Sequence, residues 1–151
     1  MGKVRVGDKA PPFALRGTGE RTYKLSDYSE TGVILAFYPG DFTPVCTKQF
    51  CSYRDDGDRI EALGMPMLGI SPQTVESHER FAEQNGLGVP LLHDEDKRVA
   101  RAYGVLGPGA FVRRSIFLID AEGVVRYRKV ALFGLRYQDV GDLERAVDAV
   151  R

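Results

Sequence analysis

The sequence has no net charge and no long apolar run. Its 21 Lys and Arg residues balance 21 Asp and Glu residues, so no net field attracts nucleic acid or an anionic membrane. The longest apolar stretches, Val33 to Tyr38 and Ile116 to Ile119, have the length of strands and are too short to cross a bilayer. We therefore expect a protein that binds neither nucleic acid nor a membrane.

Residues that bind metals or direct secretion are also scarce. Only two cysteines and two histidines are present, whereas a zinc site needs about four ligands. His78 and His93 do not lie at finger-like spacing from the cysteines, so we expect no metal site and treat both histidines as structural or solvated. The segment from Met1 to Asp8 lacks the apolar stretch of a signal peptide, which predicts a cytoplasmic protein.

The chain has the composition and length of one globular domain, which we place at 1–151. Its 151 residues are 43% hydrophobic and 28% charged, which argues against disorder. Strand-like and helix-like segments alternate, as in an α/β fold with a central sheet between helices. The expected strands are 33–38, 67–71, 91–92, 115–119 and 124–130, with a hairpin turn at 120–123. The expected helices are 43–63, 74–85, 97–103 and 143–150.

Cys46 falls in the first turn of the helix that follows the first buried strand. Thr43 is the candidate N-cap and Pro44 occupies the first helical position. The unpaired N–H groups and the positive dipole end of this turn favour a thiolate, the nucleophilic form of cysteine. The dipole contributes only about 0.3–2 kcal/mol, so a nearby cation is needed for full ionisation. The alternative is that Cys46 is a small buried apolar residue.

The segment from Pro39 to Cys51 resembles the active-site signature of the peroxiredoxins. Pro39, Thr43 and Cys46 match the pattern P-x-x-x-T-x-x-C, and the wider stretch is similar to the bacterioferritin-comigratory (PrxQ) subgroup. The resemblance covers nearly the whole chain, including the opening from residue 7 to 15 and the segment from residue 91 to 96.

This resemblance implies a thioredoxin-like fold with a mixed sheet and a cofactor-free thiol peroxidase. Cys46 would attack the hydroperoxide and become a sulfenic acid, and Cys51 would resolve it as an intramolecular disulfide. Thr43 would hydrogen-bond the thiolate and the peroxide while also capping the helix, and Pro39 would shield the sulfur from water. The implied partners are hydrogen peroxide or an organic hydroperoxide and thioredoxin or a similar dithiol. The enzyme would serve antioxidant defence.

Arg114 is the candidate for the missing cation. It falls where the peroxiredoxins keep an active-site arginine at the start of a strand. Arg113 is the competitor, and strand alternation would point the two side chains to opposite faces. Three departures from the subgroup stand nearby: Val45 replaces Gly, Gln49 replaces Glu and Ile116 replaces Ser or Thr. Gln49 puts a Glu–Arg pair in doubt.

Two other functions are compatible with parts of the sequence. A thiol–disulfide oxidoreductase on the same fold would have the motif C-x-x-C, whereas Cys46 and Cys51 form C-x4-C. A non-enzymatic binding or holdase module would leave both thiols without a role. A nucleotide-binding protein is disfavoured because no glycine-rich phosphate loop follows the first buried strand. We expect a monomer, with a weak homodimer as the alternative.

Overall fold

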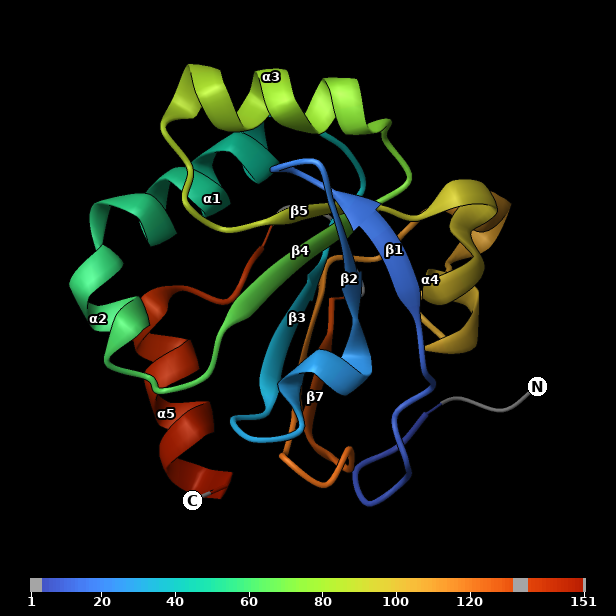
Figure 1. The fold of residues 1–151 in the computed structure, drawn as a ribbon, viewed down its shortest axis with the longest axis vertical. Coiled ribbons are helices and arrows are strands. Elements are labelled where there is room, and N and C mark those ends of the chain that lie inside the picture. The colour runs from blue at the N-terminus through green and yellow to red at the C-terminus, as the bar shows by residue number, and fades with distance from the viewer. Residues whose placement is uncertain (1–3, 132–135, 151) are drawn as a thin grey trace.

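The computed structural model describes residues 4–131 and 136–150, and within them a seven-stranded mixed sheet lies between helices (Figure 1). The order across the sheet is β2-β1-β5-β4-β3-β6-β7. The central strands β3, β4 and β5 run parallel, whereas β6 runs antiparallel to β3. In chain order the strands are β1 (Ala14–Gly17), β2 (Arg21–Lys24), β3 (Val33–Phe37), β4 (Met67–Ser71), β5 (Leu91–His93), β6 (Ser115–Ile119) and β7 (Val125–Val130).

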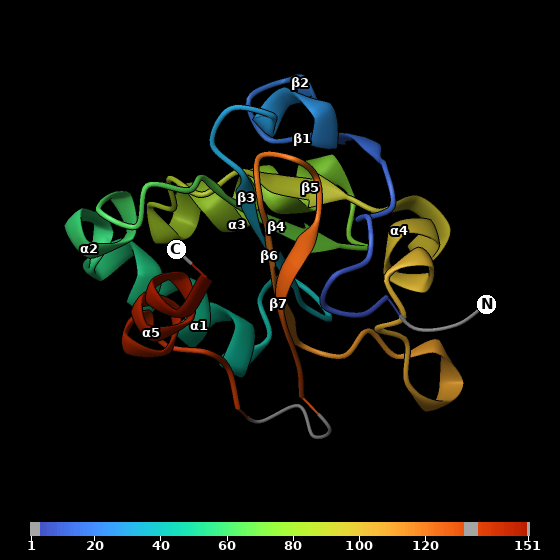
Figure 2. The same cartoon turned by 90° about the horizontal axis from the view of Figure 1, so that it is seen from below.

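Helices cover both faces of this sheet (Figure 2). Helices α1, α3 and α5 pack on one face and α4 on the other. The helices of the described ranges are α1 (Pro44–Asp55), α2 (Gly57–Glu61), α3 (Val75–Asn85), α4 (Arg98–Ala102) and α5 (Val140–Val150), with 3-10 turns at Leu25–Tyr28, Glu95–Lys97 and Pro108–Ala110. This arrangement confirms the predicted α/β class.

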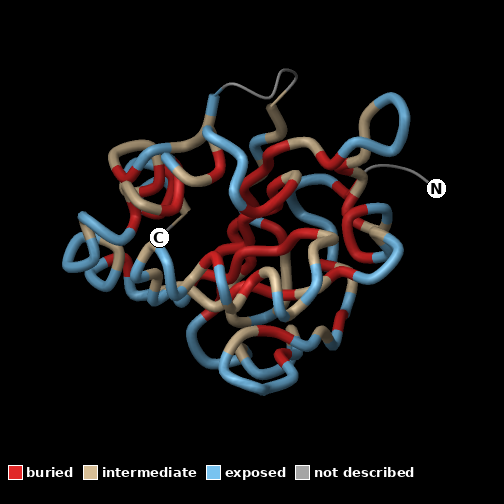
Figure 3. The backbone as a smooth tube through the Cα atoms, turned by 90° about the horizontal axis from the view of Figure 1, so that it is seen from above, coloured by how far each residue is buried: buried red, intermediate tan, exposed pale blue. Residues whose placement is uncertain are grey.

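Strand β3 lies at the centre of the core. Its odd-numbered residues pack with the α4 side and its even-numbered residues with α1, α3 and α5. All five of its side chains are fully buried, which explains why the strand reads as a continuous apolar run rather than an alternating one. The buried backbone is concentrated in the middle of the molecule (Figure 3). A strand fixed on both faces gives the loop after it a rigid base.

Most predicted elements form, with boundaries that differ by at most three residues. The structure confirms the strands 67–71 and 115–119 without change. The expected turn also forms, because the Asp120 carboxylate accepts bonds from two backbone N–H groups and Gly123 adopts a φ of 81°. In the described ranges no helix is long and apolar enough to cross a membrane.

Two predictions of secondary structure need correction. The single helix expected from Thr43 to Leu63 is interrupted at Asp56, whose φ of −105° and ψ of 35° are not helical. The interruption precedes Gly57, and glycine has the lowest helix propensity of any residue except proline. The hairpin of β1 and β2 was not predicted, because these short strands at the sheet edge expose most of their side chains and carry little apolar alternation.

Candidate active site

Cys46 lies in the first turn of α1, beyond the C-terminal end of β3. Its side chain is fully buried. Thr43 has the extended backbone of an N-cap residue, with φ −77° and ψ 147°, and Pro44 begins the helix. The first turn therefore presents its free N–H groups and the positive end of the helix dipole to the Cys46 sulfur.

The Arg114 guanidinium contacts this sulfur directly. Arg114 Nη1 donates a hydrogen bond to Cys46 Sγ at 3.0 Å, and the residue is only 5% exposed. Pairing of β6 with β3 brings it there, because Ser115 is opposite Phe37 at the end of β3. Arg113 points elsewhere, because its guanidinium lies beside Gly107. A Cβ built on that glycine would lie only 2.9 Å from Arg113 Nε. The structure thus places Arg114, and not its neighbour, beside the thiol.

Gln49 links this arginine to the rest of α1. Arg114 Nη1 also donates to Gln49 Oε1 at 2.9 Å, and Gln49 Nε2 donates to the Tyr53 hydroxyl at 3.0 Å. Tyr53 in turn donates to the Gln138 carbonyl at 2.6 Å. Burial raises the pKa of Tyr53 well above its usual value, so the hydroxyl keeps its proton. A neutral amide orients the guanidinium without competing, as a glutamate would, for its positive charge.

The Thr43 hydroxyl makes a different bond from the expected helix cap. Thr43 Oγ1 donates to the Gly40 carbonyl at 3.0 Å, so the predicted capping bond is replaced by a bond within the loop. Pro39 is half-buried in the same loop, directly after the buried Tyr38. Both residues therefore lie between β3 and the helix that carries Cys46.

Cys51 lies on α1 but in different surroundings from Cys46. It is half-buried, and its Sγ contacts Asn85 Oδ1 at 3.5 Å near the end of α3. Asn85 Nδ2 donates to the Phe81 carbonyl at 3.0 Å, which fixes the amide. Both thiols are free. The structure therefore shows the dithiol form, with both cysteines in one continuous helix.

Several contacts of this site were not expected from the sequence. Gln49 and Tyr53 are four residues apart, a spacing that places them on one helix face, but their hydrogen bond was not predicted. The loss of a Glu at position 49 put a pair with the arginine in doubt, and the structure shows that the Gln49 amide still accepts from Arg114. The contact of Cys51 with Asn85 joins two helices, so no pattern within a short stretch of sequence predicts it. Ile116, the third departure, is buried in the same apolar cluster as Cys46. In the ranges described, no group of three or more His, Cys, Asp or Glu side chains could hold a metal.

Comparison with known proteins gives consistent matches over most of the chain. The AhpC/TSA family matches residues 6–128. Peroxiredoxin Bcp of Bacillus subtilis (strain 168) is 38% identical over 136 residues, which are 84% of this chain and 87% of that protein. Peroxiredoxin Bcp of Escherichia coli (strain K12) is 37% identical over 134 residues, 84% of this chain and 86% of that protein.

Solved structures agree with these sequence matches. The crystal structure of peroxidoxin BcpB from Mycobacterium tuberculosis superposes with a TM-score of 0.86 at 29% identity, covering 98% of this chain and 99% of that one. A structure of Mycobacterium tuberculosis AhpC gives the same TM-score at 21% identity, which supports the fold alone.

Proposed function

This chain belongs to the AhpC/TSA family of thiol peroxidases, with its thioredoxin-like fold, and from that premise we propose that Cys46 is the residue that attacks the hydroperoxide. The observation that carries the proposal is the bond from Arg114 to the buried Cys46 sulfur at the N-terminus of α1. Two positive groups, a guanidinium and a helix dipole, meet at this thiol and stabilise its ionised form.

The chemistry balances without a cofactor. The Cys46 thiolate attacks one peroxide oxygen, the O–O bond breaks, and the sulfur becomes a sulfenic acid while the other oxygen leaves as an alkoxide or hydroxide that takes up a proton. Arg114 stabilises the charge on the thiolate and on the leaving oxygen. Thr43 would turn its hydroxyl from the Gly40 carbonyl towards the peroxide, and Pro39 would limit the access of water.

Cys51 is proposed to complete the cycle. Its thiol condenses with the Cys46 sulfenic acid, which forms the disulfide and releases water. A dithiol such as thioredoxin then reduces this disulfide by exchange and becomes oxidised itself. Hydrogen peroxide and organic hydroperoxides are the proposed substrates, and antioxidant defence is the proposed role.

A coupled assay tests this cycle. Peroxide consumption is measured with thioredoxin, thioredoxin reductase and NADPH for the wild type and for Cys46→Ser and Cys51→Ser. We expect steady turnover by the wild type only. Turnover by Cys46→Ser would contradict the assignment of the attacking thiol. Reduction of a protein disulfide by the wild type without any peroxide consumption would favour a thiol–disulfide oxidoreductase.

We also propose that the enzyme is a cytoplasmic monomer. A dithiol reductant and two free thiols fit a reducing compartment. Within residues 4–131 and 136–150 the exposed large apolar side chains are Val6, Phe42 and Phe111, which come from three separate loops. A stable interface usually covers a contiguous apolar patch, and three single side chains from separate loops argue against one. Size-exclusion chromatography with light scattering measures the molar mass in solution. The mass of a dimer would contradict this proposal.

A further inference from the structure

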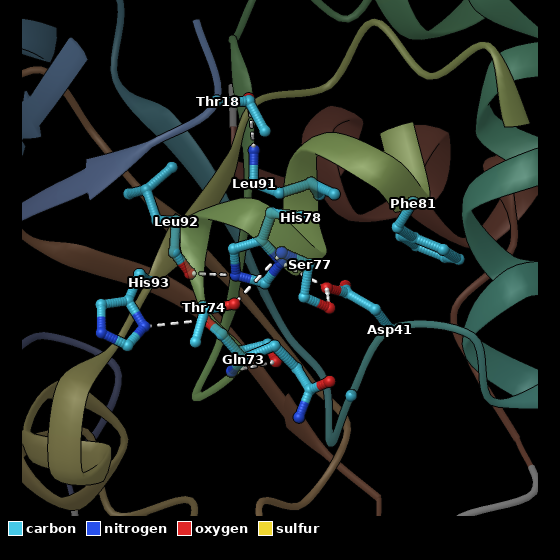
Figure 4. A network of polar contacts seen from close by, with 12 residues as sticks. Thr18, Asp41, Gln73, Thr74, Ser77, His78, Phe81, Leu91, Leu92 and His93 are labelled. Carbon is cyan, nitrogen blue, oxygen red and sulfur yellow. Dashed lines mark hydrogen bonds and ion pairs between the residues drawn. The ribbon is translucent and has the colours of Figure 1, made fainter. Parts of the chain in front are cut away.

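A second buried polar cluster lies behind the active-site loop, on the side of α3 (Figure 4). The side chains of Asp41 and His78 are both fully buried, and His78 Nδ1 lies 2.7 Å from Asp41 Oδ2. The other ring nitrogen, Nε2, lies 3.0 Å from the Leu92 carbonyl of β5. The imidazole therefore bridges the loop after β3 and a central strand of the sheet.

The hydrogen-bond partners define how the protons are placed. A carbonyl only accepts, so His78 Nε2 carries a proton and donates to Leu92. The Asp41 carboxylate accepts from the Tyr38 hydroxyl at 2.7 Å and from the Ser77 hydroxyl at 2.7 Å. Burial, and then the charge of Asp41, raise the pKa of Tyr38 well above its usual value, so Tyr38 remains a donor. His78 Nδ1 faces Asp41 Oδ2 at 2.7 Å, so a hydrogen bond joins the two side chains.

This cluster is attached to the part of the loop with the least favourable backbone. Phe42 adopts a φ of 64°, a left-handed conformation that non-glycine residues rarely take and that needs support from the surrounding structure. Its ring packs against Phe81 of α3 with the centroids 5.3 Å apart. Thr43, which follows, is the N-cap of the helix that carries Cys46. The position of Asp41 thus determines where residues 42 and 43 can lie.

We propose that Asp41 and His78 are positioning residues of the peroxidase: their pair, anchored on the Leu92 carbonyl, holds the loop 40–43 so that Thr43 and the first turn of α1 can bind the peroxide beside Cys46. This inference rests on the proposed function. It assigns a role in the reaction to a histidine that lies outside the Cys46–Arg114 contact.

The replacement of Asp41 by Asn supplies a stringent test. Asparagine keeps the shape, and its amide oxygen can accept from Tyr38 while its NH2 group donates to Ser77 Oγ and to His78 Nδ1; His78 Nε2 keeps its proton and still donates to the Leu92 carbonyl. Asp41→Asn should therefore retain the loop and react with peroxide at close to the wild-type rate. Asp41→Ala removes all three bonds and should slow the reaction by about tenfold to a hundredfold, as a misplaced reacting group does.

Two rates measured on each variant separate positioning from other effects. One is the second-order rate of Cys46 oxidation by hydrogen peroxide, and the other is the rate of Cys46 alkylation by iodoacetamide, which needs the thiolate but not the peroxide-binding geometry. We expect Asp41→Ala to lose the first rate selectively. Ser77→Ala, which removes one of the three bonds and leaves little space, should show a smaller loss of the same kind even if Asp41→Ala does not fold. His93→Gln serves as the control histidine.

Each other outcome overturns the inference. A wild-type peroxide rate in folded Asp41→Ala, or in Ser77→Ala if the former does not fold, would leave the pair with a structural role only. An equal loss of both rates would show that the pair acts on the thiolate, and a loss in Asp41→Asn as large as in Asp41→Ala would show that charge rather than hydrogen bonding matters. A wild type that consumes no peroxide would overturn the proposed function itself, and this inference with it.

Discussion

Formation of the Cys46–Cys51 disulfide should unwind the start of α1. Both cysteines lie in the continuous helix Pro44–Asp55. Five residues of α-helix rise about 7.5 Å and turn about 140° beyond a full circle, which on a cylinder of about 2.3 Å radius separates the two Cα atoms by about 8.7 Å. A disulfide needs about 4.4–6.8 Å between Cα atoms, so rotation of side chains cannot close the gap.

The structure indicates which contacts are lost when the helix opens. Cys46 must leave the Arg114 guanidinium and Cys51 must leave Asn85. Phe50, between them, is 1% exposed and packs on Tyr38 with the ring centroids 4.8 Å apart. Opening should therefore lower the protection of amides 46–53 by about a hundredfold or more, which corresponds to about 2.7 kcal/mol of local stability. An opened segment would also present the disulfide to thioredoxin.

Amide hydrogen exchange of the dithiol and disulfide forms measures this change. The intramolecular bond is first confirmed by mass, and amides of α3 serve as the internal reference. Cys51→Ser treated with one equivalent of peroxide is the matched control, because it is oxidised at Cys46 but cannot form the bond and should keep its helix. Equal protection of residues 44–54 in both forms would refute the reasoning, and a disulfide between two chains would indicate intermolecular resolution.

Three further predictions concern single side chains. Arg114→Ala should slow the reaction of Cys46 with peroxide, because the guanidinium that contacts the sulfur is lost, whereas Arg113→Ala should not. The second-order rate with hydrogen peroxide is measured for both variants, and a larger loss in Arg113→Ala would contradict the assignment. Gly69→Ala should lower the free energy of unfolding measured by urea titration by about 1–3 kcal/mol, because its Cβ would lie 2.8 Å from Leu91 Cδ2. An unchanged free energy of unfolding would show that the Leu91 side chain on β5 moves aside at little cost. Asp94→Ala should destabilise the fold by about 1–3 kcal/mol, since this buried carboxylate accepts two backbone N–H groups of α4, while the peroxide rate is retained; a lost rate would mean that α4 affects the site.

The predictable parts of the fold are those defined by burial on both faces. Strands β3, β4 and β6 appear in the sequence as apolar runs because neither face meets water. Helix α3 is bounded by Thr74, whose hydroxyl accepts from Ser77 N, and by Gly86 with a φ of 60°, which are the residue types that begin and end helices. The edge hairpin of β1 and β2 has neither signal and was missed.

Some residues of the active site could likewise be predicted from the sequence and others could not. The family resemblance selected Arg114, whereas strand alternation predicted only that Arg113 would point to the opposite face. The contact of Gln49 with Arg114 spans 65 residues, and that of His78 with Asp41 spans 37. Such contacts form only when β6 and α3 pack beside α1 and the loop after β3. No pattern within a short stretch of sequence around either partner predicts them.

The mass of the intact protein after one equivalent of hydrogen peroxide tests the central claim most directly. We predict that the wild type loses two hydrogen atoms and remains a single chain, that Cys51→Ser gains one oxygen atom at Cys46, and that Cys46→Ser is unchanged. An oxygen gained by Cys46→Ser, or a wild type of unaltered mass while peroxide remains in solution, would contradict the account.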